Sequence, residues 1–250
     1  IRDRLGFDDP NGIVCEPFRQ WVIEDNFVKG RPDWDEVGAQ FAPDVEPFED
    51  MKLRMLNGTH STMAYLGYLS GYETIAETIA DPDFKKLIIA MMTEEIAPTV
   101  EVDADLMEYR DALIHRYSNA MLKHRSWQIA MDGSQKLPQR LLNTVRDRYA
   151  AGAPVTRLAL GVAGWMRYVT GIDEKGNDID VRDPMAEKLV ALGKSAGREA
   201  AAIAAGYFAL TEIFGTDLSA NEAFRNEVTG HLESLLKNGA RKTVQTLVAG

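Results

Sequence analysis

Residues 51–61 read MKLRMLNGTHS, and the rest of the chain is interpreted outward from this stretch. On an α-helix, at about 100° per residue, Lys52, His60 and Asn57 fall near about 0°, 80° and 140°. Glu49 falls near about 60° on the same side. One helix face would then present an amine, an imidazole, a carboxamide and a carboxylate within an otherwise apolar run. Because a buried polar group needs a partner or a function, the pattern predicts a site.

The rest of the chain is also mostly helical in pattern, with apolar residues at helical spacing between Gly and Pro breaks. Helices are expected over 49–68, 72–80, 83–96, 105–118, 119–129, 138–151, 156–170, 185–193, 198–214, 221–238 and 240–249. Residues 131–137 and 172–184 are expected to be loops. Alternating βαβ units, GxGxxG and GxxxxGK[ST] are missing from the sequence. We therefore predict a mostly α, multi-helical domain over residues 48–250, with an irregular N-terminal segment, residues 1–47, packed on it.

Composition limits the partners of the chain. Its 250 residues are 45% apolar and carry a formal net charge of −10. That charge argues against nucleic acid or an anionic membrane as the main partner, because both attract basic surfaces. No stretch of about 18 apolar residues suggests a membrane span. The single cysteine, Cys15, fits a reducing cytoplasm and reads as a small buried hydrophobe rather than a nucleophile.

Each residue of the opening stretch also has a structural interpretation. A lysine usually lies on the surface, but the apolar neighbours of Lys52 favour partial burial, which would make it a usable acid or base near neutral pH. Asn57, followed by Gly58, reads either as a helix end or as an amide donor to a developing negative charge. His60 reads as a structural residue or a second donor. No metal is expected, because no HExxH or clustered acidic residues accompany His60.

Spacing adds a geometric problem to this site. Lys52 and His60 would lie about 12 Å apart along a straight helix. Either a substrate bridges the two side chains, or the Asn57-Gly58 pair bends the helix between them.

A second polar cluster lies in residues 124–140, HRSWQIAMDGSQKLPQR. Arg125, Gln128, Lys136 and Arg140 flank the turn sequence Asp132-Gly133-Ser134. The cluster is either a capped loop with solvated bases or a cationic rim able to hold hydroxyls or a carboxylate. These two interpretations stay open from spacing alone. The acidic pair at 94–95 is expected to be a solvated helix end.

These residues resemble the long-chain mannitol dehydrogenase family of polyol and sugar-acid dehydrogenases. The match runs through EPFRQWVIEDNF, GRP, GAQF and EDMKLRMLNGTHSTMAYLGYLSG, and its hallmark is the spacing of Lys52, Asn57 and His60. Two later stretches, RYSNAMLKHRSWQIAMDGSQKLPQR and LALGVAGWMRYVTGIDEKGN, are most similar to the fructuronate reductase (D-mannonate oxidoreductase) branch. The resemblance covers nearly the whole chain.

The resemblance implies a metal-independent, NAD- or NADP-dependent secondary-alcohol dehydrogenase of two domains. This chain resembles only the helical C-terminal domain, so the N-terminal Rossmann domain, its expected partner, would account for the missing GxGxxG. Lys52 would be the general acid/base, with Asn57 and His60 holding the reacting oxygen and Glu49 passing protons to solvent. Lys136 would contact the substrate, and Arg125 is inferred to bind its carboxylate.

Several functions remain open at this point. The first is oxidoreduction of a small sugar acid, D-fructuronate/D-mannonate. Tagaturonate reductase and mannitol 2-dehydrogenase are close alternatives, and a helical binding or assembly module is the non-enzymatic one. The sequence does not give NAD or NADP preference, or oligomeric state.

Overall fold

The computed structural model describes residues 2–12, 16 and 18–250, and Cys15 lies outside them. The chain divides into two compact units, residues 1–48 and 49–250. The mostly helical prediction is confirmed in the second unit. The predicted packing of the N-terminal segment on the helical domain stays a prediction.

The first unit has little regular structure in its described part. Its elements are α1 (Arg2–Leu5), β1 (Val22–Glu24), the 3₁₀-helix η1 (Trp34–Val37) and β2 (Gln40–Ala42). Strands β1 and β2 pair in parallel, with Val22 opposite Gln40. Trp21 stacks on Trp34 at a ring-centroid distance of 5.3 Å, and Phe27 meets Trp34 edge-on at 6.5 Å. Aromatic contacts thus support this small sheet, although Trp21 keeps 58% of its surface exposed.

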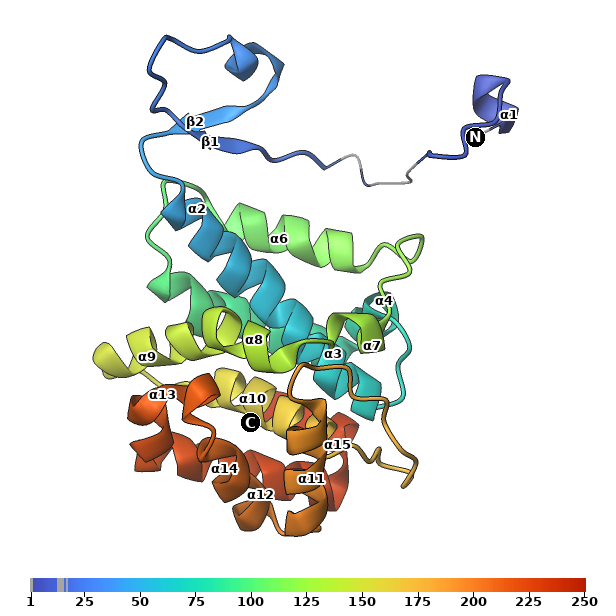
Figure 1. Cartoon of the computed structure of the whole chain (residues 1–250), viewed down its shortest axis with the longest axis vertical. Coiled ribbons are helices and arrows are strands. Elements are labelled where there is room, and N and C mark those ends of the chain that lie inside the picture. Colours follow the sequence, from blue (N-terminus) through green and yellow to red (C-terminus); the bar gives the residue numbers. More distant parts are fainter. Residues whose placement is uncertain (1, 13–15, 17) are drawn as a thin grey trace. The chain divides into compact units, whose positions relative to one another are not determined.

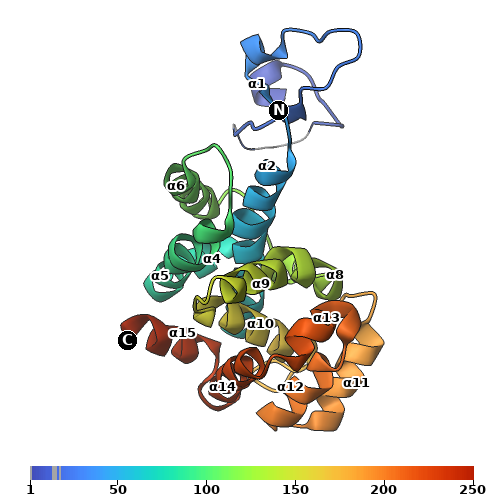
Figure 2. The same ribbon diagram turned by 90° about the vertical axis from the view of Figure 1, so that its left-hand side faces the viewer.

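The second unit is an assembly of helices, which Figures 1 and 2 show from two directions. From the boundary onward its elements are α2 (Glu46–Met51), η2 (Lys52–Gly58), α3 (Thr59–Leu69), α4 (Ile75–Ala80), α5 (Pro82–Ala90), η3 (Met91–Ile96), η4 (Ala97–Thr99), α6 (Leu106–Tyr117), α7 (Ser126–Ile129), α8 (Gly133–Leu137), η5 (Pro138–Leu142), α9 (Asn143–Ala150), α10 (Thr156–Val169), α11 (Ala186–Ala196), α12 (Ala200–Phe208), α13 (Thr211–Ala220), α14 (Glu222–Asn238) and α15 (Ala240–Ala249). Three of them, η2, η3 and η5, are π-helical, and η4 is a 3₁₀-helix.

Helix α10 lies at the centre of this unit, between α3 and the C-terminal helices α12 and α14 (Figures 1 and 2). Every residue from Leu158 to Val169 is buried. A helix that is apolar on all sides is stable only when it is surrounded by others. This central position follows from the sequence LALGVAGWM, which has no polar face.

Two glycines bring α10 close to α3. A Cβ on Gly161 would lie 2.6 Å from Oγ1 of Thr62, and one on Gly164 would lie 2.8 Å from Cδ2 of Leu66. Real Cβ atoms do not approach other atoms so closely, so Thr62 or Leu66 would have to move to admit a larger residue. The contact fixes α3, which follows directly after η2.

Glu95 corrects the expectation of a solvated acidic helix end. Its side chain is 1% exposed, and its carboxylate accepts hydrogen bonds from the backbone N–H groups of Arg157 and Leu158, each at 2.9 Å. These are free donors in the first turn of α10, where a negative charge is favourable. Only Glu94 is exposed, and it forms an ion pair with Arg157 at 2.8 Å.

Three expected boundaries are wrong. Residues 133–137 are helical rather than a loop, because the Asp183 carboxylate accepts from the backbone N–H of Ser134 at 2.8 Å and caps the new helix α8. Only 126–129 of the expected helix 119–129 forms, since Arg125 pairs with Thr74 in an extended bridge. The expected helix 198–214 is two helices, broken at Leu210, whose ψ of 77° is not helical.

Candidate active site

The opening stretch adopts a π-helical turn, η2, inserted between two α-helices. A π-helix bonds residue i to i+5 and appears mainly as single turns at functional sites. The wider turn brings residues five apart, such as Lys52 and Asn57, closer in angle than an α-helix does. The α-helical spacing assumed from the sequence sets the same two residues about 140° apart. The expected alternative is a bend at Asn57-Gly58, whereas Gly58 keeps helical backbone angles and the structure shows a π-turn over Lys52–Gly58.

Two hydroxyl groups stabilise this π-turn. Oγ1 of Thr59 donates to the Met55 carbonyl at 2.6 Å, and the Tyr117 hydroxyl donates to the Leu56 carbonyl at 2.9 Å. A change from α to π spacing disturbs the regular pairing of backbone carbonyls. The hydroxyls supply donors to the affected carbonyls, and Tyr117 comes from α6, so a distant helix supports the turn.

Lys52 projects from η2 into solvent. Its side chain is exposed, and no ion pair or hydrogen bond joins it to another described residue. Partial burial of Lys52 was expected from its apolar neighbours, and this expectation is wrong in the present chain. Those neighbours point elsewhere, since Met55 is fully buried while Lys52 faces outward. The adjacent Arg54 is buried instead, and it forms ion pairs with Asp50 at 2.8 Å and with Asp147.

Glu49 and Asn57 flank the exposed amine. Glu49 is exposed on α2, and Asn57 is half-buried near the end of η2. No hydrogen bond or ion pair among the described residues joins either side chain to Lys52. The structure therefore places Glu49, Lys52 and Asn57 on one continuous helical run and leaves their polar groups available to a ligand.

His60 lies on the first turn of α3, against Tyr117 and His124. The ring centroid of His60 is 4.7 Å from that of Tyr117 and 5.8 Å from that of His124. Its Nε2 atom is buried without a hydrogen-bond partner among the described residues. Burial, together with the positive charges of His124 and Arg140, lowers the pKa of His60 to about 3. The imidazole is therefore uncharged at neutral pH, and one ring nitrogen is a hydrogen-bond donor.

Lys136 and Arg140 lie one turn apart on α8 and η5. Lys136 is half-buried and approaches Asp132 at 3.7 Å. Burial, and then the charge of Arg140, lowers the pKa of the Lys136 amine. Nη1 of Arg140 donates to Oγ of Ser61 at 3.1 Å, which places this guanidinium beside His60. Arg140 thus lies near His60 and one turn from Lys136, whereas the sequence places it only in the cationic rim around the Asp-Gly-Ser turn.

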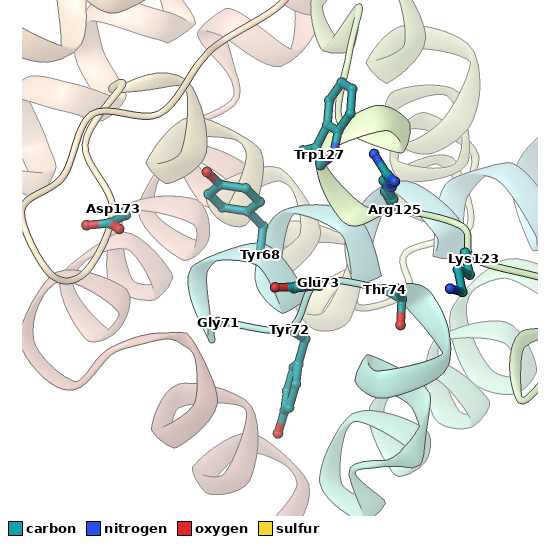
Figure 3. A pocket seen from close by; sticks show the side chains of 9 residues that line it. All are labelled: Tyr68, Gly71, Tyr72, Glu73, Thr74, Lys123, Arg125, Trp127 and Asp173. Atoms are coloured by element: carbon teal, nitrogen blue, oxygen red, sulfur yellow. The ribbon is translucent and has the colours of Figure 1, made fainter. Parts of the chain in front are cut away.

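Arg125 lines a separate cavity of about 570 Å³. Figure 3 shows this cavity, with Arg125 near Trp127 and Lys123 beyond it. The cavity lies at the C-terminal end of α3, toward Tyr68, whereas His60 lies at the N-terminal end of the same helix. None of Lys52, Asn57 and His60 lines it. This cavity is therefore separate from the motif side chains.

The residues that the structure describes give two further results. No group of three or more His, Cys, Asp or Glu side chains is arranged to hold a metal ion. No helix in this part of the chain is long and apolar enough to cross a membrane.

The site is an amine, an amide and an uncharged imidazole on adjoining turns, with Arg140 near the imidazole and Lys136 one turn from Arg140. Such an arrangement can hold an oxygen of a small polar substrate and exchange a proton with it. Residues 44–236 match the family model of the mannitol dehydrogenase C-terminal domain. The chain therefore belongs to the mannitol dehydrogenase family.

Individual relatives support the same assignment. The chain is 56% identical to the D-mannonate oxidoreductase of Escherichia coli K12, over 99% of this chain and 51% of that protein. It is 35% identical to the mannitol 2-dehydrogenase of Aspergillus niger, over 98% of this chain and 50% of that protein. The fold matches Pseudomonas fluorescens mannitol 2-dehydrogenase in ternary complex with NAD and D-mannitol, with a TM-score of 0.89 and 38% identity over 99% of this chain and 50% of that chain. The chain spans about half the length of these relatives.

Proposed function

We propose that this chain is the catalytic domain of an NAD(P)-dependent secondary-alcohol dehydrogenase, and that its substrate pair is D-mannonate and D-fructuronate. The observation that supports the proposal is the π-turn that carries Lys52 and Asn57, followed on the first turn of α3 by the uncharged His60. The 56% identity to a D-mannonate oxidoreductase favours a sugar acid. The D-mannitol named for the structural relative favours a neutral polyol as the second candidate.

In this proposal Lys52 is the general acid and base. Its amine protonates the carbonyl oxygen when the ketone is reduced and removes the proton when the alcohol is oxidised. Asn57 donates to the same oxygen through its amide, and His60 donates through its imidazole, so that both stabilise the negative charge that develops there. Glu49, one turn before Lys52, exchanges protons between the amine and solvent. Lys136 binds substrate hydroxyls.

The dinucleotide cofactor has little of its site in this chain. The described strands are β1 and β2 alone, and no Gly-rich turn joins either of them to a helix in the way that a dinucleotide site requires. When bound, the cofactor supplies or accepts the hydride. The exposed position of Lys52 fits a site that is completed by a second, cofactor-binding domain.

We propose that domain as the partner of the first unit. Parallel sheets are usually covered on both faces and have more strands than the two observed here. The first unit leaves Trp21 58% and Val37 72% exposed. A larger parallel sheet in the same protein would pair with β1 or β2 and cover these side chains.

The test is a substrate panel on the protein that carries this chain together with its cofactor domain. Oxidation of D-mannonate and of D-mannitol is followed with NAD⁺ and, separately, with NADP⁺. The proposal expects kcat/KM for D-mannonate to exceed that for D-mannitol. Faster turnover of D-mannitol would instead make the protein a polyol dehydrogenase. If the protein oxidises neither D-mannonate nor D-mannitol and does not reduce D-tagaturonate, a binding or assembly module is favoured.

A further inference from the structure

Arg140 is a half-buried cation with almost no protein partner. Nη1 donates to Oγ of Ser61 at 3.1 Å. Nε is buried and makes no hydrogen bond, and none is formed by Nη2 among the described residues. Nε and Nη2 form one edge of the planar guanidinium, and this edge matches the two oxygens of a carboxylate. This edge has no acceptor among the described residues.

Three other arginines with little exposure have protein acceptors for their terminal nitrogens, although Nε of Arg54 and of Arg167 is likewise buried without a hydrogen bond. Arg54 pairs with two carboxylates, and Arg157 contacts both Glu94 and Glu95. Arg167 donates to the backbone carbonyls of Ile172 and Asp173. Burying a charge without a partner is costly, and these side chains avoid the cost within the protein. For Arg140, an acceptor from outside the chain would do the same.

The two carboxylates close to Lys136 are already engaged. Asp132 faces Lys136 at 3.7 Å. Asp183 accepts from Oγ of Ser134 at 2.6 Å and from its backbone N–H at 2.8 Å. Neither acid forms an ion pair with Arg140 among the described residues. The positive charge of its guanidinium, which contacts Ser61 next to His60, therefore has no carboxylate partner there.

We propose that Arg140 binds the carboxylate of the substrate and thereby determines specificity for sugar acids over neutral polyols. The inference rests on the proposed function, and it names the residue that recognises the acid end of the substrate. Contact with Ser61 fixes the guanidinium one residue from His60, which holds the reacting oxygen in that function. A guanidinium in this position can donate two parallel hydrogen bonds to a carboxylate. A hydroxymethyl group has a single oxygen and no negative charge, so it cannot accept this charged pair of hydrogen bonds. Arg125, in its separate cavity, is the rival for this role.

The experiment compares two substrates that differ only at this end of the molecule. D-mannonate and D-mannitol share a carbon chain, with a carboxylate in one and a hydroxymethyl group in the other. In the full-length enzyme, Arg140→Gln should lower kcat/KM for D-mannonate by about 10- to 100-fold, the loss expected for charged hydrogen bonds. The value for D-mannitol should change less than about 3-fold. Arg140→Lys keeps the charge and loses the paired N–H groups. Its kcat/KM for D-mannonate should lie between those of the wild type and Arg140→Gln.

The ratio of the two kcat/KM values is the readout, because partial misfolding lowers both values together. Equal losses on both substrates would overturn the proposal. The proposal would also be overturned if Arg125→Gln lost activity on D-mannonate selectively while Arg140→Gln kept the wild-type ratio of the two kcat/KM values.

Calorimetric titration of D-mannonate separates this inference from the proposed function. If the wild type binds D-mannonate without oxidising it, and Arg140→Gln binds at least 10-fold more weakly, the carboxylate site stands and the dehydrogenase proposal fails. If D-mannonate is oxidised by wild type and variant with one KM, the dehydrogenase stands and the role of Arg140 fails. If the wild type neither binds nor oxidises D-mannonate, both fail.

Discussion

Gly58 lies directly against the backbone carbonyl of Arg140. A Cβ on residue 58 would be 2.5 Å from that oxygen, closer than real Cβ atoms come. The contact joins the π-turns η2 and η5, so the backbone that carries Asn57 is fixed against the backbone that carries the guanidinium. The glycine that reads as a helix end in the sequence is a point of close helix packing in the structure.

Gly58→Ala should therefore destabilise the protein. Helix propensity alone favours alanine by about 1 kcal/mol, but overpacking against a backbone atom costs about 1–3 kcal/mol. We expect a net loss in the free energy of unfolding, measured by urea denaturation. We also expect kcat/KM to fall by more than the fraction of folded protein does. The added methyl group pushes η2 and η5 apart and so displaces Asn57 relative to Arg140.

Gly230→Ala is the matched control. Gly230 lies within α14, and nothing lies within 4 Å of its expected Cβ. Alanine there should stabilise the chain by about 0.4–1 kcal/mol. If Gly58→Ala were also stabilising, the close contact between the two turns would be wrong.

Lys52→Met should lower turnover strongly without affecting stability. The amine is exposed and unpaired among the described residues, so its removal costs no folding contact. Loss of a general acid/base lowers kcat by about 10²- to 10⁴-fold. The measurements are steady-state kinetics and Tm. Lys86→Met, which replaces an exposed lysine on α5, is the control and should keep full activity. Comparable rates in the two variants would remove Lys52 from the mechanism.

Much of the helical architecture can be predicted from the sequence, because apolar periodicity and Pro or Gly breaks act locally. LALGVAGWM has no polar face and predicts a buried helix, which α10 is. Glu95 shows the limit of such prediction. Its burial depends on the free N–H groups of Arg157 and Leu158, about sixty residues away in the chain. No local pattern distinguishes it from the solvated Glu94.

The candidate site divides in the same way. The spacing of Lys52, Asn57 and His60 can be read from the sequence, but the π-turn cannot, since it depends on the hydroxyl of Tyr117 from α6. Arg140 and Arg125 look equivalent in the sequence because both flank the same Asp-Gly-Ser turn. Tertiary structure separates them, placing Arg140 beside Ser61 and Arg125 in the cavity of Figure 3.

Glu95→Gln should destabilise the helical domain by about 1–3 kcal/mol. The amide can accept at only one oxygen, so one of the two N–H groups in the first turn of α10 loses its acceptor and stays buried. Urea denaturation measures the change. Glu94→Gln, which removes an exposed ion pair with Arg157, should cost less than about 1 kcal/mol. Similar costs at the two neighbours would contradict the capping role of Glu95.

His60 should make the protein sensitive to acid. Burial lowers the pKa of its imidazole to about 3, below the value of 6.5 in the unfolded chain. Between these two pH values the unfolded state binds a proton that the folded state does not. The stabilising contribution is therefore complete above pH 6.5 and declines as the pH falls, by about 1.4 kcal/mol per pH unit.

His60→Gln should remove this decline. The difference in the free energy of unfolding between wild type and variant should change by about 2 kcal/mol between pH 7 and pH 5, with the wild type losing more. Urea denaturation at several pH values gives this difference. His231, whose pKa is also lowered by burial, is present in both proteins, so its contribution cancels. A difference that stays constant from pH 7 to pH 5 would mean that His60 takes up a proton in the folded protein as readily as in the unfolded chain. In that case the imidazole would be charged in mild acid and could not remain the neutral donor that the proposed reaction assigns to it.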